Sequence, residues 1–135
     1  MKKISLILLS AVALYAAEIE WNYSYEDARV VAQKEKKPML LFMNKAGCES
    51  CEFMHKVLAE EVVKMYVEKH YVPVSLTPAS KDIPRELIPR STPVFHFVTS
   101  EGVKVQESLL GGKQASGFIR TLRKGVRAFK KQTKG

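Results

Sequence analysis

Cysteine is scarce in this chain: its 135 residues include only Cys48 and Cys51, which stand two residues apart. A Cys-x-x-Cys pair can be a redox dithiol, half of a zinc site, a haem attachment point or a structural disulfide. Haem attachment requires a histidine directly after the second cysteine, and residue 52 is glutamate, so this possibility is excluded. A disulfide around only two intervening residues removes little entropy from the unfolded chain, so a purely structural role explains the pair poorly.

Long apolar runs are missing after the first 17 residues, so no later stretch could span a membrane, which requires about 20 residues. The first stretch, "MKKISLILLSAVALYAA", has two lysines, then an apolar run over residues 4–14, then small residues. This is the pattern of a secretory signal peptide. We therefore predict a signal peptide over residues 1–17, one domain over residues 18–135 and a periplasmic location. The alternative is an uncleaved N-terminal anchor.

Acidic residues are absent from the stretch "RTLRKGVRAFKKQTKG", where basic residues are frequent. The chain has 22 basic and 14 acidic side chains, a formal net charge of +8; without Lys2 and Lys3 the balance is 20 against 14, so +6. A basic tail can bind nucleic acid or an anionic membrane surface. An exported protein does not ordinarily meet nucleic acid, so we expect no such partner. We interpret the tail as the solvated face of a helix, with docking on acidic partners or membrane lipid as the alternative.

The apolar pattern of the first half predicts two helices around a buried strand. A first helix follows the capping residue Ser24 and stops at Pro38. The fully apolar run at residues 39–43 then predicts a buried strand. A second helix is predicted from Cys48 onward, with a possible break near Ala59. Its apolar positions recur at spacings of three and four residues: Met54, Val57, Leu58, Val62 and Met65.

The second half predicts three strands and a last helix. Strands are expected at residues 71–76, 93–98 and 103–109, the last two as a hairpin, with a loop at residues 77–91. The helix that follows has an apolar face made of Ala115, Phe118, Ile119, Leu122, Val126 and Phe129. An early strand–helix–strand unit with parallel strands and a late hairpin predict an α/β fold, with a central mixed sheet and helices on both of its faces.

At this point the sequence resembles the thioredoxin-fold proteins, over nearly all of residues 20–130. The stretch "EDARVVAQKEKKPMLLFMNKAGCESCEFM" is most similar to exported thioredoxin-like proteins, and "STPVFHFV" resembles the loop and strand in which a cis-proline faces the active cysteines. The resemblance implies a thioredoxin fold with the Cys-x-x-Cys pair at a helix N-terminus. It implies that Pro93 is the cis-proline, preceded by Thr92.

The sequence departs from thioredoxin itself at three places around the cysteines. Gly47 stands where thioredoxin has tryptophan, and Glu49 and Ser50 replace its Gly-Pro pair. Phe42 stands where thioredoxin has a buried aspartate, which accepts the proton of the second thiol. These departures argue against a general cytosolic-type thioredoxin, and they leave open how Cys51 loses its proton.

The resemblance implies a periplasmic thiol–disulfide oxidoreductase, working as a reductase or isomerase and needing no cofactor. Cys48 would attack substrate disulfides and Cys51 would resolve the mixed disulfide. Backbone N–H groups and the helix dipole would lower the pKa of the Cys48 thiol below its free value of about 8.5. Substrate contacts are predicted at Gly47, Glu49, Ser50, Thr92 and Pro93. The expected partners are proteins with disulfides or dithiols and a membrane electron carrier.

Two other classes of function stay open. A copper chaperone is the first, because thioethers and thiolates suit Cu(I); Met39, Met43, Met54 and Met65 are nevertheless expected to pack in the core. His55 could share a helix face with Cys51, but three ligands from one helix would be strained, so no metal site is predicted. The second class is a non-catalytic interaction domain on the same fold.

Overall fold

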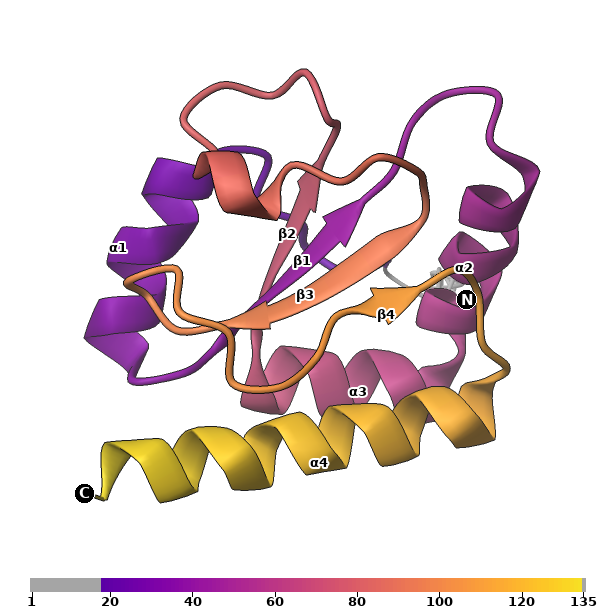
Figure 1. Cartoon of the computed structure of the whole chain (residues 1–135). Helices are drawn as coiled ribbons and strands as arrows, with labels where there is room; N and C mark the ends of the chain where they lie inside the picture. The colour runs from indigo at the N-terminus through magenta and orange to yellow at the C-terminus, as the bar shows by residue number, and fades with distance from the viewer. Residues whose placement is uncertain (1–17, 135) are drawn as a thin grey trace, which may run out of the picture.

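Four strands form one mixed sheet in the order β2-β1-β3-β4 in the computed structural model, which describes residues 18–134 (Figure 1). The strands are β1 (Met39–Met43), β2 (Val72–Leu76), β3 (Val94–Val98) and β4 (Leu109–Leu110). β2 is parallel to β1, β3 is antiparallel to β1, and β4 is antiparallel to β3. The mixed sheet confirms the predicted α/β fold class. The predicted signal peptide at residues 1–17 lies outside the described residues.

Helices cover both faces of the sheet, as predicted. They are α1 (Tyr25–Glu35), α2 (Glu49–Ala59), α3 (Glu61–His70) and α4 (Ala115–Thr133), with one 3₁₀ turn, η1 (Arg85–Leu87). Because side chains alternate along a strand, β1 divides between two cores. Leu40 and Phe42 pack with α2, α3 and α4, whereas Met39, Leu41 and Met43 pack with α1 and η1. All five residues of β1 are buried, which explains the continuous apolar run.

The possible break near Ala59 is confirmed, so the helical stretch from Cys48 onward is two helices. Glu60 has extended backbone angles, φ −63° and ψ 131°, so α2 ends at Ala59 and α3 begins at Glu61. The break changes which residues face the core: Val63 and Val67 are buried in α3. Val62 and Met65 are 58% and 61% exposed. The placement of these two residues on the apolar face was therefore wrong, because the spacing was counted across the break.

The strand predicted at residues 103–109 is wrong for most of its length, since β4 comprises only Leu109 and Leu110. Two polar side chains of this segment bind partners away from the strand ladder. The Gln106 amide donates to the carbonyl of Thr121 in α4 at 3.0 Å, and the Ser108 hydroxyl lies 2.6 Å from Nδ1 of His96. The segment keeps only a short antiparallel pairing with β3, through the bridge between Val98 and Lys104 and the bond from the Val105 N–H to the Phe97 carbonyl, and it links the sheet to α4.

α4 packs along the sheet through the apolar face that its sequence predicts, with Phe118, Leu122 and Val126 buried. Its docking includes one buried polar contact, in which the Tyr71 hydroxyl donates to the carbonyl of Leu122 at 2.7 Å. Gly125 lies against Tyr71, so the glycine lets the helix approach closely. Between residues 18 and 134, no helix has the length and apolarity required to cross a bilayer.

Candidate active site

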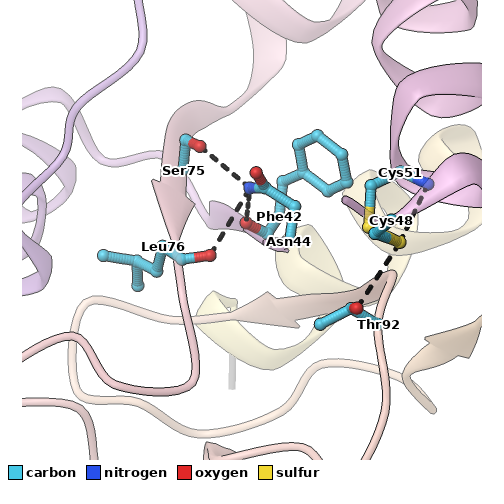
Figure 2. The surroundings of a disulfide bond; sticks show 7 residues. All are labelled: Phe42, Asn44, Cys48, Cys51, Ser75, Leu76 and Thr92. Atoms are coloured by element: carbon cyan, nitrogen blue, oxygen red, sulfur yellow. Dashed lines mark hydrogen bonds between the residues drawn. A yellow bond between two sulfur atoms is a disulfide. The ribbon is translucent and has the colours of Figure 1, made fainter. Parts of the chain in front are cut away.

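Cys48 lies where the loop after β1 meets the first turn of α2, and it is the N-cap residue of that helix. The loop begins at Asn44, whose side-chain amide donates to the carbonyl of Phe42 and to the hydroxyl of Ser75, both at 3.0 Å (Figure 2). Asn44 therefore ties the end of β1 to β2 and fixes where the loop starts. As N-cap, Cys48 has extended backbone angles, and its sulfur faces the free N–H groups of the helix.

Cys48 and Cys51 form a disulfide, with their Cα atoms 5.2 Å apart. The backbone N–H of Cys51 donates to Sγ of Cys48 at 3.2 Å. The same N–H and the helix dipole favour negative charge on Cys48 once the bond is reduced. Cys51 is 1% exposed, whereas Cys48 is partly exposed. A substrate can therefore reach the sulfur of Cys48, and Cys51 can reach it only from inside.

The loop before β3 brings Thr92 and Pro93 to the other side of Cys48. The Thr92 hydroxyl donates to Sγ of Cys48 at 3.5 Å, across 44 residues of sequence (Figure 2). The peptide bond between Thr92 and Pro93 is cis. The Pro93 carbonyl accepts a hydrogen bond from the N–H of Gly111 at 2.9 Å, so β4 and its following turn hold this loop in place.

Phe42 lies fully buried in the core that also contains Cys51. Its ring stacks on that of Phe95, with centroids 4.7 Å apart and an interplanar angle of 1°. The ring of His55 meets Phe42 edge-on, with centroids 4.9 Å apart. The position that the sequence comparison assigned to a buried aspartate is thus part of an aromatic stack. Phe42 itself cannot accept the proton of Cys51.

The other predicted contact residues lie around the exposed side of the pair. Gly47 precedes Cys48 in the left-handed region, with φ +74°, and it is exposed. Glu49 and Ser50 are exposed in the first turn of α2. The fold thus gathers Gly47, Glu49, Ser50, Thr92 and Pro93 near Cys48, with Pro93 buried and Thr92 partly buried. Their roles in substrate binding stay a prediction.

An apolar border of this site was not predicted from the sequence. Phe53 is 44% exposed on α2, and Leu110 is 72% exposed on β4, opposite Val94. Gly112 lets the two elements meet, because a Cβ there would lie 3.3 Å from the Phe53 ring. Gly111 and Gly112, directly after Leu110, could have indicated a close approach of two segments. The sequence pattern alone gave no reason to place that approach beside α2.

Three of the four methionines lie away from the cysteines. Met54 shares the core of Cys51, where its Sδ accepts a hydrogen bond from the N–H of Lys113 at 3.2 Å. Met39 and Met43 belong to the core on the α1 side of the sheet, whereas Cys51 belongs to the opposite core. Met65 is exposed on α3. Within residues 18–134, no three histidine, cysteine or carboxylate side chains are grouped as a metal site would require. No observation therefore favours the copper-chaperone alternative.

The arrangement is a thiol–disulfide exchange centre. It combines an accessible sulfur at a helix N-terminus with a buried second sulfur in bonding distance, and two hydrogen-bond donors act on the accessible one. Exchange proceeds when a thiolate attacks a disulfide sulfur and forms a mixed disulfide. The pair can therefore pass two electrons to or from a partner without a bound cofactor taking part in the step.

Comparison with known proteins agrees with this geometry. A thioredoxin-like family profile matches residues 20–100. A thioredoxin from Thermus thermophilus is 24% identical, with a TM-score of 0.65, over 79% of this chain and 86% of that one. The C-terminal domain of DsbD from Neisseria meningitidis is 21% identical, with a TM-score of 0.61, over 73% and 90%. A disulphide isomerase from Xylella fastidiosa is 22% identical, with a TM-score of 0.54, over 90% and 99%. No match was found among curated proteins.

Proposed function

This chain belongs to the thioredoxin-like family. We propose that it is an exported thiol–disulfide oxidoreductase that reduces or isomerises disulfides of substrate proteins. The observation that carries the proposal is the asymmetry of the pair: Cys48 is accessible and receives two hydrogen bonds, whereas Cys51 is buried behind it. A disulfide with only a structural role has no need of this difference.

In the reductive direction, the Cys48 thiolate attacks one sulfur of the substrate disulfide and expels the other as a thiolate. Cys51, after losing its proton, attacks the Cys48 sulfur of the mixed disulfide. The substrate leaves with two thiols, and the protein is left with the Cys48–Cys51 disulfide seen here. Two electrons have moved to the substrate, so a donor must supply two electrons before the next cycle. A membrane electron carrier is the donor that we propose.

In the isomerising direction, Cys48 alone opens the wrong disulfide. A thiol of the substrate itself then displaces Cys48, so Cys51 is not consumed and no net electrons are transferred. One structural relative is described as a disulphide isomerase, which supports the isomerising direction as a candidate beside the reductive one. The export of the chain rests on the sequence pattern of residues 1–17.

The proposal is tested with residues 18–135, which contain the whole described core from Ile19 to Val126. Reduced Cys51→Ala protein is mixed with insulin, whose chains are linked by disulfides. We expect a stable mixed disulfide through Cys48, detected by non-reducing electrophoresis and mass spectrometry. Cys48→Ala protein, the matched control, should form none. If neither variant captures insulin or another disulfide protein, the proposal is wrong.

A second assay separates the two directions. Recovery of ribonuclease from a mispaired form should survive Cys51→Ala if the protein is an isomerase. Reduction of insulin with repeated turnover should be lost in the same variant, because it needs Cys51 to release the substrate.

A further inference from the structure

Charge is distributed very unevenly over this protein. Residues 113–134 carry eight basic side chains and no acidic one, a net charge of +8. Residues 18–112 carry 12 basic and 14 acidic side chains, a net charge of −2. The positive charge of the domain therefore belongs to α4 and its flanks, and the part that holds the cysteines has none in excess.

The six basic residues of α4 and its C-cap residue Lys134 form one stripe. An α-helix turns about 100° per residue, so the seven positions fall within an arc of roughly 120°. All seven are exposed: Arg120, Arg123, Lys124, Arg127, Lys130, Lys131 and Lys134. The opposite arc of the helix is the buried one. The two ion pairs found in residues 18–134, Arg29–Glu26 and Lys37–Glu35, do not involve α4. The stripe is thus not neutralised within the domain.

Apolar side chains border this stripe on the neighbouring helix. α3 lies beside α4, and the Arg123 guanidinium carbon is 5.9 Å from the centroid of the Tyr66 ring (Figure 1). Val62 and Met65, on the outward side of Tyr66, are 58% and 61% exposed. Glu68 lies on a different side of α3, where it lines a cavity with Lys37 and Lys64. α3 itself carries Glu61 and Glu68 against Lys64 and Lys69, so the basic charge of the combined surface comes from α4. Val62 and Met65 add an exposed apolar edge beside it.

We propose that this α3–α4 surface docks the protein on a membrane surface that contains anionic phospholipid. The stripe is the outward face of one straight helix, roughly 28 Å long, and a convex face of this kind fits a flat surface better than a binding groove. Lysine and arginine near anionic headgroups favour binding, and adjacent apolar side chains insert at the headgroup boundary. The cavity beside the last turn of α4 is lined by Phe129, Gln132 and Thr133, which at about 100° per residue fall outside the arc of the stripe.

The docked orientation leaves the cysteines accessible. The loop that leads into α2 lies at the opposite end of the molecule from α4 (Figure 1). Cys48, at the start of α2, would therefore lie away from the bilayer while α4 lies along it. Membrane docking does not depend on the redox activity. It adds a location, the bilayer surface, at which the protein works.

The test is flotation of residues 18–135 with vesicles of phosphatidylethanolamine containing about one quarter phosphatidylglycerol, against vesicles of phosphatidylcholine. We expect binding to the anionic vesicles only, with affinity that falls as salt rises. A stripe variant combines Arg120→Gln, Lys124→Gln, Arg127→Gln and Lys131→Gln. A body variant removes the same charge elsewhere: Lys34→Gln, Lys56→Gln, Lys81→Gln and Lys104→Gln, all exposed positions.

The stripe variant should bind at least about tenfold more weakly than the unmodified chain, and the body variant should stay within about twofold of it. Met65→Ser should weaken binding further at high salt, where the apolar contribution remains. Equal loss in the two charge variants would show a response to net charge alone and would overturn the proposal. Binding to soluble polyglutamate but not to the anionic vesicles would also overturn it, and would assign the surface to an acidic protein instead.

Discussion

The hydroxyl of Thr92 donates a hydrogen bond to Sγ of Cys48 at 3.5 Å, and the N–H of Cys51 donates to the same sulfur at 3.2 Å. One donor comes from the loop before β3 and the other from the first turn of α2, so the sulfur lies between two elements that the sheet positions. Both donors act on the atom that carries the negative charge when the disulfide is opened. Hydrogen bonds to a charged acceptor are stronger than those to a neutral one.

Replacing Thr92 by valine should therefore make the thiolate form of Cys48 less stable relative to the thiol. Thr92→Val keeps the shape but removes the donor, at a cost to the thiolate of about 1 kcal/mol. The pKa of the Cys48 thiol should rise, as followed by thiolate absorbance in the reduced protein, and its attack on a small aromatic disulfide at pH 7 should slow. Thr92→Ser, which keeps the hydroxyl, should behave like the unmodified chain. Equal behaviour of the two variants would contradict a role for this hydrogen bond.

The second step should depend on pH in a different way from the first. Cys51 is buried, and Phe42 beneath it offers no proton acceptor. An apolar environment disfavours a thiolate, so release of the partner by Cys51 should accelerate as pH rises through the alkaline range. A two-phase reaction with an aromatic disulfide resolves the steps. A second phase already at its maximum near pH 7 would contradict this expectation, and would indicate His55, one turn along α2 from Cys51, as the acceptor.

His96 should make the stability of the fold depend on pH. It is 4% exposed, and its Nε2–H donates to the Leu87 carbonyl at 2.7 Å, so the neutral ring accepts at Nδ1 from the hydroxyl of Ser108. Burial lowers the pKa of His96; the Leu87 hydrogen bond partly opposes this, and the charge of Lys104 adds to the lowering. Between the lowered pKa of folded His96 and its ordinary value of about 6.5, the unfolded chain binds more protons than the folded one. The free energy of unfolding should therefore fall as pH drops below about 6.5.

Urea unfolding at pH 8 and at pH 5 tests this expectation in residues 18–135. His96→Gln should lower stability at pH 8, because a buried hydrogen-bonded ring is lost, but it should reduce the further loss at pH 5. His70→Gln is the comparison, since desolvation lowers the pKa of the partly buried His70 as well, with smaller burial. An unchanged pH response in His96→Gln would show that other groups cause it.

Gly125 should be the most sensitive small residue of α4. A Cβ there would overlap the Tyr71 hydroxyl and lie 2.9 Å from the Gln106 amide nitrogen, so Gly125→Ala should destabilise by about 1–3 kcal/mol. Tyr71→Phe alone should cost about 1 kcal/mol, because the hydrogen bond to Leu122 is lost. Combined with Gly125→Ala, it should cost less than the sum, since removing the hydroxyl makes room for the methyl group.

Gly117 provides the control for this prediction. A Cβ at that position meets only the flexible side chain of Lys113, at 3.4 Å or more. Gly117→Ala should therefore stabilise α4 by up to about 1 kcal/mol, through the lower backbone entropy of alanine. A loss of stability at Gly117 as large as at Gly125 would mean that helix docking is not what makes Gly125 necessary.

Apolar spacing and residues that end helices and strands predicted most of the fold. These signals failed where contacts between distant segments determine the local structure. β1 and the apolar face of α4 followed from their apolar patterns. The exposure of Met65 did not, because the apolar spacing was counted through the predicted break near Ala59, and Glu60 changes the helical phase there. The strand at residues 103–109 failed because Gln106 and Ser108 bind partners that no local pattern shows.

The site shows the same division between local and long-range information. The cysteine pair and its place at a helix start followed from sequence and resemblance. The hydrogen bond from Thr92 and the contact of Gly112 with Phe53 join segments more than forty residues apart, so only the folded chain shows them. Asn44, which fixes the start of the loop to Cys48, was missed for the same reason: its partner Ser75 is 31 residues away.

The most direct test of the account is the redox equilibrium of the Cys48–Cys51 pair in glutathione buffers, measured on metal-free protein of residues 18–135. We predict a reversible two-electron couple that titrates one disulfide per chain. A potential near about −270 mV would indicate a reductase, and one near about −120 mV an oxidant or isomerase. A pair that does not exchange reversibly with glutathione would contradict the assignment of Cys48 and Cys51 as a redox centre.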